Sequence, residues 1–415
     1  MFDNYLRIAI AVLLRRKFLT LVNLFGTVLT LTVLVVAAAI LDSMLHPRGA
    51  EVDQEHFLVL DYLCMKGANS TGCGLPGRQF FRQYIEPLET PDKVSYATNS
   101  SPAISYVDRG KVTSQLRRTD AAYWEILHFK VLAGRAIEAD DVTAGRKVAV
   151  INEATAEAFF RGSSPLGKSI TLGEQTFEVI GVVVNEPQTS EIAFADVWVP
   201  YTTSETPNYE EQWDGDGVIL LFVKNANARE AVQAELRKSL QGFVFTPDPG
   251  RFDTATAFAR TGVERTASRV LGEEQGKEPN TRRFVGVALL LALLFMLLPA
   301  VNMANINIGR ILERSAEIGL RKATGASMRT LIGQFIFENV VLTFLGGVIA
   351  FAVASLILHT LNGGLFTYGT LTVNFRVFLV GLALILVFGF LSGIYPAWRM
   401  ARLEPAAALR GFRHV

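Results

Sequence analysis

The stretch LTLVNLFGTVLTLTVLVVAAAIL, residues 19–41, carries no charged residue over a length that crosses a bilayer. Three later runs have the same character: residues 284–301 and 377–398 carry no charge, and residues 331–358 carry only Glu338. The chain as a whole is half apolar, with a mean hydropathy of +0.29. The sequence therefore predicts four transmembrane helices, at 19–42, 284–308, 331–358 and 376–398.

Basic residues predict how these helices are oriented. Lys and Arg are abundant in residues 1–18, in the short loop 309–330 and in the tail 399–415, and they are absent from the short loop 359–375. Cytoplasmic loops carry such an excess. Both termini and the 309–330 loop are thus expected in the cytoplasm, with 359–375 and the long segment 43–283 outside. Residues 1–18 alternate apolar and basic faces, which is typical of an amphipathic helix lying on the inner surface.

The first apolar run could instead belong to a cleaved signal peptide, because Ala37, Ala38 and Ala39 lie near its end. The run is too long for a signal peptide, however, and a long segment precedes it. We expect an uncleaved anchor.

The segment 43–283 is long enough for a sizeable core or for two subdomains, one of them roughly 112–200. Its pattern is mixed α/β. The predicted strands are 56–61, 112–117, 147–151, 177–184, 197–200 and 218–223, and the predicted helices are 76–85, 120–128, 152–160 and 228–240. The tracts 185–196 and 244–283 have poor periodicity and are interpreted as connections. The fold class is therefore an α-helical, four-span membrane domain with an extracytoplasmic mixed α/β domain inserted between spans one and two.

The sequence GSSPLGKS, residues 162–169, fits the Walker A pattern of nucleotide-binding loops. In such loops a strand precedes the motif and a helix follows it, so that the helix N-terminus meets the phosphates. Here a predicted helix, 152–160, comes first and a predicted hairpin, 169–184, comes after. Pro165 removes a backbone donor as well. We interpret the motif as an external helix-to-hairpin turn, and we expect no nucleotide or other cofactor on this chain.

Catalysis and metal binding have little support. No serine elbow, HExxH motif or framed carboxylate pair is present, so the chain is expected to be non-catalytic, with no catalytic, cofactor-binding or metal-binding residues. The two cysteines, Cys64 and Cys73, lie in a glycine-rich stretch of the external segment. A disulfide is the favoured interpretation in an oxidising compartment, and free thiols and a metal site are the alternatives.

Several stretches resemble one family. Residues 119–183, with VAVIN at 148–152 and PLGK at 165–168, resemble the periplasmic core domain of MacB-type ABC-transporter permeases. Residues 301–347 contain ERSAEIGLRKATGA at 313–326 and resemble the FtsX-type permease segment, and SGIYPAWRMARLEPAAALRG at 392–411 is similar to the end of that segment. The three stretches occur in the family's order and in the matching topological positions.

The resemblance implies a multi-pass protein of the bacterial inner membrane whose large domain is periplasmic. It also implies a homodimer, or a heterodimer with a paralogous permease, on ABC ATPase subunits that carry the ATP and Mg²⁺. Because the first span begins near residue 19, we expect the ATPase to be a separate chain. A periplasmic adaptor and an outer-membrane channel are further partners that the family suggests. Membrane lipids surround the spans, and no nucleic acid is expected.

The 309–327 segment is expected to couple this chain to the ATPase. The coupling residues are Glu313, Arg314, Glu317, Ile318, Gly319, Arg321, Lys322 and Gly325. Charged faces with pairs four residues apart suit a polar, reversible interface, and the glycines permit close approach. The alternative is a short helix that only lies on the inner surface.

Two functions follow. In the first, ATP hydrolysis moves the external domain, a mode called mechanotransmission, and drives export or extraction of a peptide, an antibiotic or a lipoprotein. In the second, an FtsX-like lever activates an external partner such as a cell-wall hydrolase. The large external domain favours the first.

Overall fold

The structure is a computed structural model that describes residues 17–46, 49–107, 110–206, 208–246, 250–272, 280–295, 297, 328–364, 367–369 and 371–401. These residues form two compact units. The helical unit comprises the described residues among 1–42, 285–361 and 371–415. The α/β unit comprises those among 43–284 and 362–370, so part of the connection between the last two long helices belongs to it.

The helical unit contains α2 (Lys17–Leu45), α11 (Met328–Gly364) and α12 (Phe375–Ala401), and residues 281–295 are helical as well. Among the described residues two helical stretches, Thr20–Leu45 and Ile336–Gly364, are long and apolar enough to cross a membrane, and Phe375–Val387 is a shorter apolar stretch. The helices predicted at 19–42, 331–358 and 376–398 are present, although α11 continues to Gly364 and shortens the predicted 359–375 loop. The four-span count stays a prediction.

A pair of glycines lets the long helices approach each other closely. A Cβ on Gly346 would meet Thr27 of α2 at 2.9 Å, and one on Gly347 would meet Leu382 of α12 at 2.8 Å. Leu31 is fully buried in this contact. Small residues at such positions are typical of helix packing in membranes.

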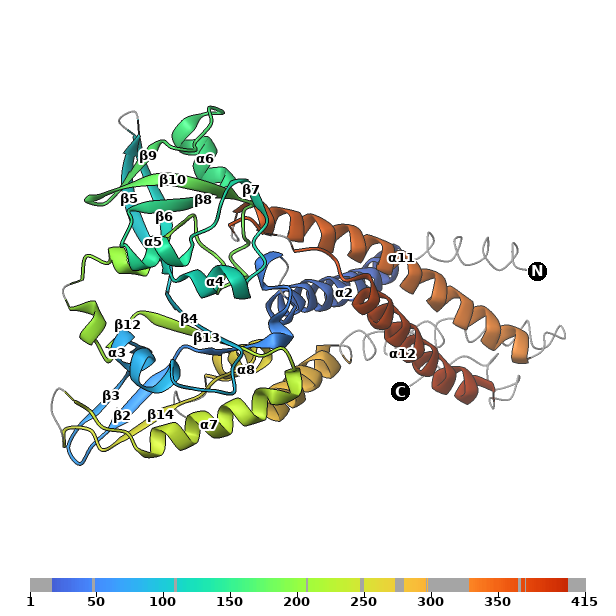
Figure 1. The fold of residues 1–415 in the computed structure, drawn as a ribbon. Coiled ribbons are helices and arrows are strands. Elements are labelled where there is room, and N and C mark those ends of the chain that lie inside the picture. Colours follow the sequence, from blue (N-terminus) through green and yellow to red (C-terminus); the bar gives the residue numbers. More distant parts are fainter. Residues whose placement is uncertain are drawn as a thin grey trace. The chain divides into compact units, whose positions relative to one another are not determined.

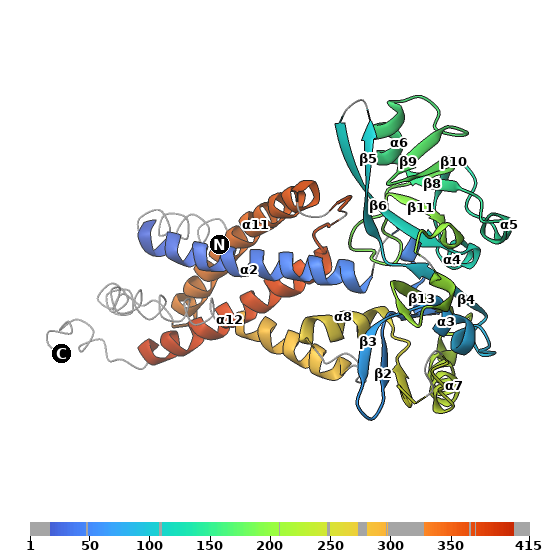
Figure 2. The same ribbon diagram turned by 90° about the vertical axis from the view of Figure 1, so that its left-hand side faces the viewer.

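The α/β unit is built on a ten-stranded mixed sheet (Figure 1). Its main path runs β1 (Phe57–Leu60), β13 (Gly217–Phe222), β4 (Lys93–Thr98), β6 (Gly110–Thr119), β11 (Val197–Pro200), β8 (Val148–Asn152), β10 (Gln175–Val183) and β7 (Val131–Gly134), with β5 (Ser101–Val107) on β6 and β9 (Ser169–Leu172) on β10. A second sheet has the order β12 (Asp214–Gly215), β3 (Thr71–Pro76), β2 (Leu63–Lys66) and β14 (Thr254–Ala257). In both views β5, β9 and β10 lie at one end of the unit and β2 and β3 at the other, where Figure 1 also labels β14 (Figure 2).

The helices of this unit are α3 (Arg78–Phe80), which continues as a π-helical turn (Phe81–Ile85), α4 (Ala121–Ile126), α5 (Ala139–Thr143), α6 (Glu153–Phe160), α7 (Arg229–Gln241) and α8 (Gly262–Leu271). Short 3₁₀ turns occupy Gly49–Glu51, Gln54–His56, Tyr201–Thr203, Tyr209–Glu211 and Ala226–Ala228. All six predicted strands and four predicted helices are confirmed. The interpretation of 244–283 as a connection is wrong, because β14 and α8 lie in it.

The GSSPLGKS segment has the predicted order. Helix α6 ends at Phe160, and β9 begins at Ser169. The Nζ of Lys168 donates to the Oγ of Ser163 at 2.7 Å and lies 5.4 Å from the ring centre of Phe160. The motif is therefore an exposed turn between a helix and a hairpin, which lacks the strand-to-helix geometry of a phosphate-binding loop.

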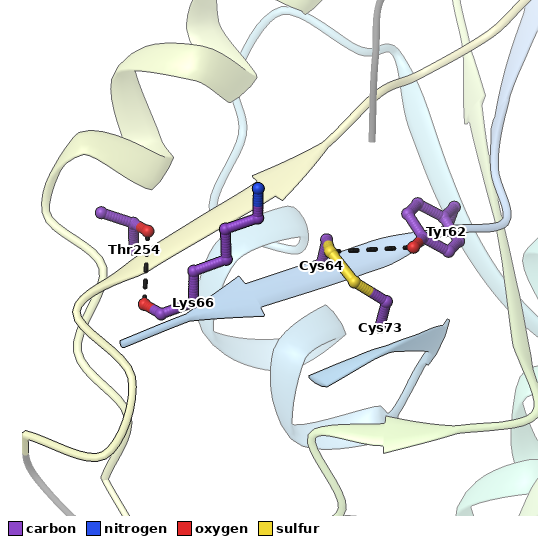
Figure 3. Close-up of a disulfide and its surroundings, with 5 residues drawn as sticks. All are labelled: Tyr62, Cys64, Lys66, Cys73 and Thr254. Atoms are coloured by element: carbon purple, nitrogen blue, oxygen red, sulfur yellow. Dashed lines mark hydrogen bonds between the residues drawn. A yellow bond between two sulfur atoms is a disulfide. The ribbon is translucent and has the colours of Figure 1, made fainter. Parts of the chain in front are cut away.

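The two cysteines face each other across the β2–β3 hairpin. Cys64 is directly opposite Cys73 in the antiparallel register, and the structure joins their Sγ atoms (Figure 3). The Tyr62 hydroxyl donates to the Cys64 Sγ at 3.7 Å. The cross-link thus ties together the two inner strands of the smaller sheet.

We expect a thiol titration to find this pair oxidised. Because the chain has only two cysteines, denatured protein purified without reductant should show no reactive thiol, and reduced protein should show two. Two reactive thiols before reduction would contradict the disulfide.

Candidate functional site: a buried charge cluster in the α/β unit

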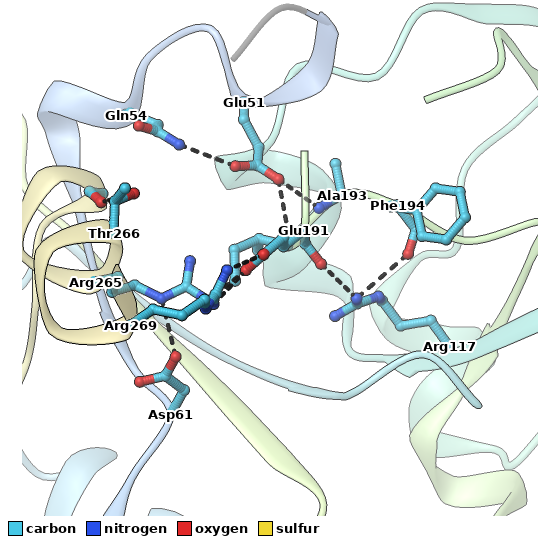
Figure 4. Close-up of polar contacts among 12 residues, drawn as sticks. Glu51, Gln54, Asp61, Arg117, Glu191, Ala193, Phe194, Arg265, Thr266 and Arg269 are labelled. Atoms are coloured by element: carbon cyan, nitrogen blue, oxygen red, sulfur yellow. Dashed lines mark hydrogen bonds and ion pairs between the residues drawn. The ribbon is translucent and has the colours of Figure 1, made fainter. Parts of the chain in front are cut away.

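The predicted coupling residues between Glu313 and Gly325 lie outside the described residues, and their role stays a prediction. The part of the chain that the structure describes contains a different polar site. Six charged side chains gather in the α/β unit and are called here the junction cluster: Glu51, Asp61, Arg117, Glu191, Arg265 and Arg269 (Figure 4). They come from the turn after α2, the end of β1, β6, the 185–196 connection and α8.

Helix α8 supplies two arginines, one turn apart. The Nε of Arg265 donates to Asp61 at 2.9 Å, and its Nη2 lies 3.5 Å from the Glu191 carboxylate. Both terminal nitrogens of Arg269 donate to the carboxylate of the same Glu191, one of them at 2.6 Å. The Arg265 side chain is 11% exposed and that of Arg269 is 54% exposed. The inner pair is therefore poorly hydrated, whereas the outer pair is in contact with solvent.

Both ends of α8 are capped, and the caps define where the helix begins and ends. Thr261 accepts from the Glu264 backbone N–H, and the Glu264 carboxylate accepts from the Thr261 backbone N–H, which is a complete capping box. Gly272 closes the other end in the left-handed conformation. Because residues four apart share a helix face, this frame turns Arg265 and Arg269 toward the same acid.

Glu51 holds the 185–196 connection in place. Its carboxylate accepts from the backbone N–H groups of Ile192 and Ala193 at 2.7 and 2.8 Å, and from the Gln54 side chain at 3.1 Å. The side chain is 2% exposed. Burial raises the pKa of the Glu51 carboxyl, and the Ala193 hydrogen bond opposes that shift. A residue from the turn after α2 thus fixes a loop that is distant in sequence.

Arg117 ties the same connection to the large sheet. Its guanidinium is 1% exposed and donates to the carbonyl oxygens of Thr98, Glu191 and Phe194 at 2.9, 2.7 and 3.3 Å. Burial lowers the pKa of Arg117. Two of these carbonyls, those of Glu191 and Phe194, belong to the 185–196 connection, and the third ends β4. Because Arg117 itself lies on β6, it fastens the connection to both strands.

A cavity of about 690 Å³ adjoins the cluster, and its wall includes Arg117, Gln188, Glu191, Arg265 and Tyr368. The described residues contain no group of three metal-ligating side chains. Asp61 and Glu191 are paired with Arg265 and Arg269, whereas Glu51 and Arg117 bind backbone groups, so the arrangement is suited to holding segments together.

A second carboxylate lies beside Glu51. The backbone N–H of Ala50 donates to the Glu186 carboxylate at 3.1 Å, and Glu186 is 2% exposed. Gly49 has a φ of 83°, and a Cβ there would come within 2.3 Å of the Glu186 oxygen. Glycine is therefore required both for the turn and for the approach of the acid. Burial raises the pKa of Glu186 to about 7, and the neighbouring Glu51 charge adds to the rise.

We expect Glu186→Gln to change how stability depends on pH. The pKa of Glu186 is higher in the folded state than its ordinary value of 4.5. The folded chain therefore holds this proton when the unfolded chain has lost it, and the native protein loses stability as pH rises from about 4.5 to 7. Glutamine cannot ionise and can still accept from Ala50. The variant should gain about 3 kcal/mol at pH 8 and nothing below pH 4.5.

The measurement is denaturant unfolding of the α/β unit by tryptophan fluorescence at both pH values, since Trp124, Trp198 and Trp213 are three of the four tryptophans in the chain. Glu157→Gln, on the exposed face of α6, is the control and should change neither value. An equal effect of Glu186→Gln at pH 4 and pH 8 would contradict the raised pKa.

None of the junction residues was predicted from the sequence. One signal was available: Thr261 and Glu264 form the T-x-x-E pattern of a capping box just before the apolar positions of α8. The acids of the 185–196 connection gave no signal, because their partners lie far away in the sequence.

Comparisons with known proteins give a consistent picture. Residues 20–239 match the family model described as MacB-like periplasmic core domain, and residues 289–405 match the one described as FtsX-like permease C-terminal. The Macrolide export ATP-binding/permease protein MacB of Azoarcus sp. (strain BH72) is 28% identical over 401 residues, covering 93% of this chain and 57% of the relative. The uncharacterized ABC transporter permease YknZ of Bacillus subtilis (strain 168) is 22% identical over 333 residues, covering 79% of this chain and 77% of the relative.

Among solved structures, the periplasmic region of MacB from Actinobacillus actinomycetemcomitans is similar, with a TM-score of 0.35 and 21% identity over 52% of this chain and 94% of that one. The chain spans about half the length of the MacB relatives it matches, from 46% to 57%. The two family models include the stretches 119–183 and 301–347 that carry the resemblance.

Proposed function

Because the chain belongs to the MacB/FtsX-type ABC-transporter permease family, we propose that it is the membrane-spanning subunit that converts ATP hydrolysis by an ABC ATPase into movement of its α/β unit. The ATPase acts on the cytoplasmic side, and the permease part itself catalyses no reaction. The α/β unit faces the periplasm, and the helices lie in the bacterial inner membrane with both termini in the cytoplasm.

The junction cluster carries this proposal. In the sequence, Glu51 lies nine residues after the end of the predicted first span at 42, and α8 ends at Leu271, 13 residues before the start of the predicted second span at 284. Both segments are fastened to the same connection, 185–196, one through the Glu51 carboxylate and the other through Glu191. That connection is in turn fastened to the large sheet by Arg117. A displacement of either span would therefore reach the sheet through these polar contacts, in addition to the direct backbone path from the first span into β1.

Polar contacts suit such a role because they have defined geometry. A bidentate arginine–carboxylate pair fixes direction as well as distance. Buried polar networks also hold one arrangement, since any partner left unpaired in a poorly hydrated site is costly. The unit then moves as a body when its attachment points move, which is the rigid-body type of switching transition.

At the cytoplasmic side, the coupling is proposed to run through Glu313–Gly325, whose charged faces would meet the ATPase. Two copies of the permease subunit, identical or paralogous, would work as a dimer. The substrate is proposed to be a peptide, an antibiotic or a lipoprotein taken from the periplasmic side, with a periplasmic adaptor and an outer-membrane channel as further partners.

Purification of the tagged chain from membranes, with identification of every bound protein, tests this function. An ATP-binding chain in stoichiometric amount, with ATPase activity that depends on the permease, is the expected result. A cell-wall hydrolase bound outside, with no export activity, would favour the regulatory lever. If no ATP-binding chain is recovered, the proposal fails.

A further inference from the structure

The connection between α11 and α12 makes an unexpected set of contacts. Residues 362–370 lie between two helices of the helical unit in sequence, yet they belong to the α/β unit. The backbone N–H of Gln188 donates to the Thr367 carbonyl at 3.0 Å, and the Thr367 N–H donates to the Gln188 side-chain oxygen at 3.3 Å. The two residues thus bind each other in both directions.

Tyr368 adds a third bond at a more buried point. Its hydroxyl donates to the Asp196 carboxylate at 2.9 Å. The same carboxylate accepts from the Asn152 side chain at 2.9 Å and from the Gln115 backbone N–H at 2.7 Å. Asn152 is itself the N-cap of α6. The tyrosine therefore binds a carboxylate that is already held by β6 and by the β8–α6 turn.

The backbone at Tyr368 has a conformation that needs such support. Its φ is 54°, in the left-handed region that a bulky side chain rarely adopts. Residues in such conformations persist when the surroundings over-determine them. Burial of the hydroxyl and the Asp196 charge together raise the pKa of Tyr368 to about 12, so it remains a donor throughout the physiological range.

The segments that hold Glu51 and α8 are the first two attachment points of the α/β unit. We infer that Thr367 and Tyr368, bound to Gln188 and Asp196, form a third one, called here the anchor. The unit turns about this anchor when the first two spans move. Only residues 365 and 366 separate the end of α11 at Gly364 from Thr367, and that length of chain reaches at most about 11 Å. The anchor therefore limits how far Gln188 can move from the end of α11. Its role in movement rests on the proposed function, whereas its existence does not.

Hydrogen exchange of the purified full-length chain in detergent, without any ATPase, tests the anchor. Tyr368→Phe removes one hydroxyl and keeps the ring. Because a hydrogen bond to a charged group is lost, the amides of Gln188 and Thr367 should exchange roughly tenfold faster, while the amides of β8 and β10 should not change. Tyr106→Phe is the matched control, since Tyr106 is 78% exposed on β5, and it should alter neither set. Unchanged exchange at Gln188 and Thr367 in Tyr368→Phe overturns the anchor.

A disulfide between positions 188 and 367 can replace the hydrogen bonds of the anchor, and it tests the contact and its role in movement separately. With Gln188→Cys and Thr367→Cys added to Tyr368→Phe, disulfide formation should restore slow exchange in that region. In the assembled complex, the same disulfide should leave the coupled ATPase activity within twofold, because the anchor stays closed while the unit turns. Loss of activity that reductant reverses would show that this contact must open, and would overturn its role as a fixed point without touching the exchange result.

Discussion

Replacing Arg265 by methionine is expected to lower the free energy of unfolding of the α/β unit by about 3 kcal/mol. Arg265 is the inner arginine of α8, bonded to Asp61 at 2.9 Å and close to Glu191. The Asp61 side chain is only 21% exposed, so its charge would be left without a partner in a poorly hydrated place. Loss of one member of such a pair costs more than the pair contributes.

The matched control is Arg269→Met. Arg269 lies on the same helix, binds the same Glu191 and loses the same charge, but it is 54% exposed, and the cost should stay below about 1 kcal/mol. Thermal unfolding followed by tryptophan fluorescence should show a fall of roughly 6–12 °C for Arg265→Met and little change for Arg269→Met. Equal effects of the two variants would mean that the junction cluster is an ordinary surface network.

Reversing both charges at Glu317 and Arg321 is expected to separate the chain from its ATPase. Within one helix the double reversal keeps an oppositely charged pair four residues apart, and that pair contributes only about 0.2–0.5 kcal/mol. At an interface the same change places like charges together, which costs several kcal/mol. We therefore expect at least tenfold less ATPase recovered with the variant.

Membrane insertion and permease–permease association should persist in this variant, because the double reversal keeps the pair within the predicted helix. Each single reversal is the internal comparison, since it breaks the intrahelical pair as well as the interface. A double variant that keeps its full complement of ATPase and full ATPase-coupled activity would leave 309–327 as a passive surface element.

The sequence predicted the elements whose side chains repeat regularly. The helices α2, α11 and α12 were visible as long apolar runs, β8, β11 and β13 as short buried runs, and β10 as an alternating one. Strands that lack such a pattern were missed. β3 reads TGCGLP, with two glycines and a proline. β5 carries Pro102, and a proline is tolerated there because β5 lies off the main path of the sheet and pairs with β6.

The junction cluster could not be predicted, for a physical reason. Its contacts with the 185–196 connection and with Asp61 join residues that are 74 to 204 positions apart, and a bond between distant segments leaves no local periodicity. The 185–196 connection was correctly predicted to lack helix and strand, but absence of regular structure did not indicate that its backbone would bind Glu51 and Arg117. Long-range polar contacts of this kind become visible only in the folded chain.

The disulfide removes both native thiols from reaction with thiol-specific labels. If Cys64 and Cys73 are bonded, engineered cysteines are the only thiols, and spin labels can be placed on the assembled complex without other changes. Tyr106 on β5 is 78% exposed, and Leu21 on α2 is 65% exposed. A label at each site reports the distance between the α/β unit and the first helix.

If nucleotide state moves the α/β unit, the distance between labels at Tyr106→Cys and Leu21→Cys must change with it. We expect pulsed electron resonance of the reconstituted complex to give one distribution of this distance without nucleotide and a shifted one with ATP trapped on the ATPase. Labels at Tyr106→Cys and Glu157→Cys, both within the α/β unit, should give the same distance in the two states. Identical Tyr106–Leu21 distributions in both states would contradict mechanotransmission by this chain.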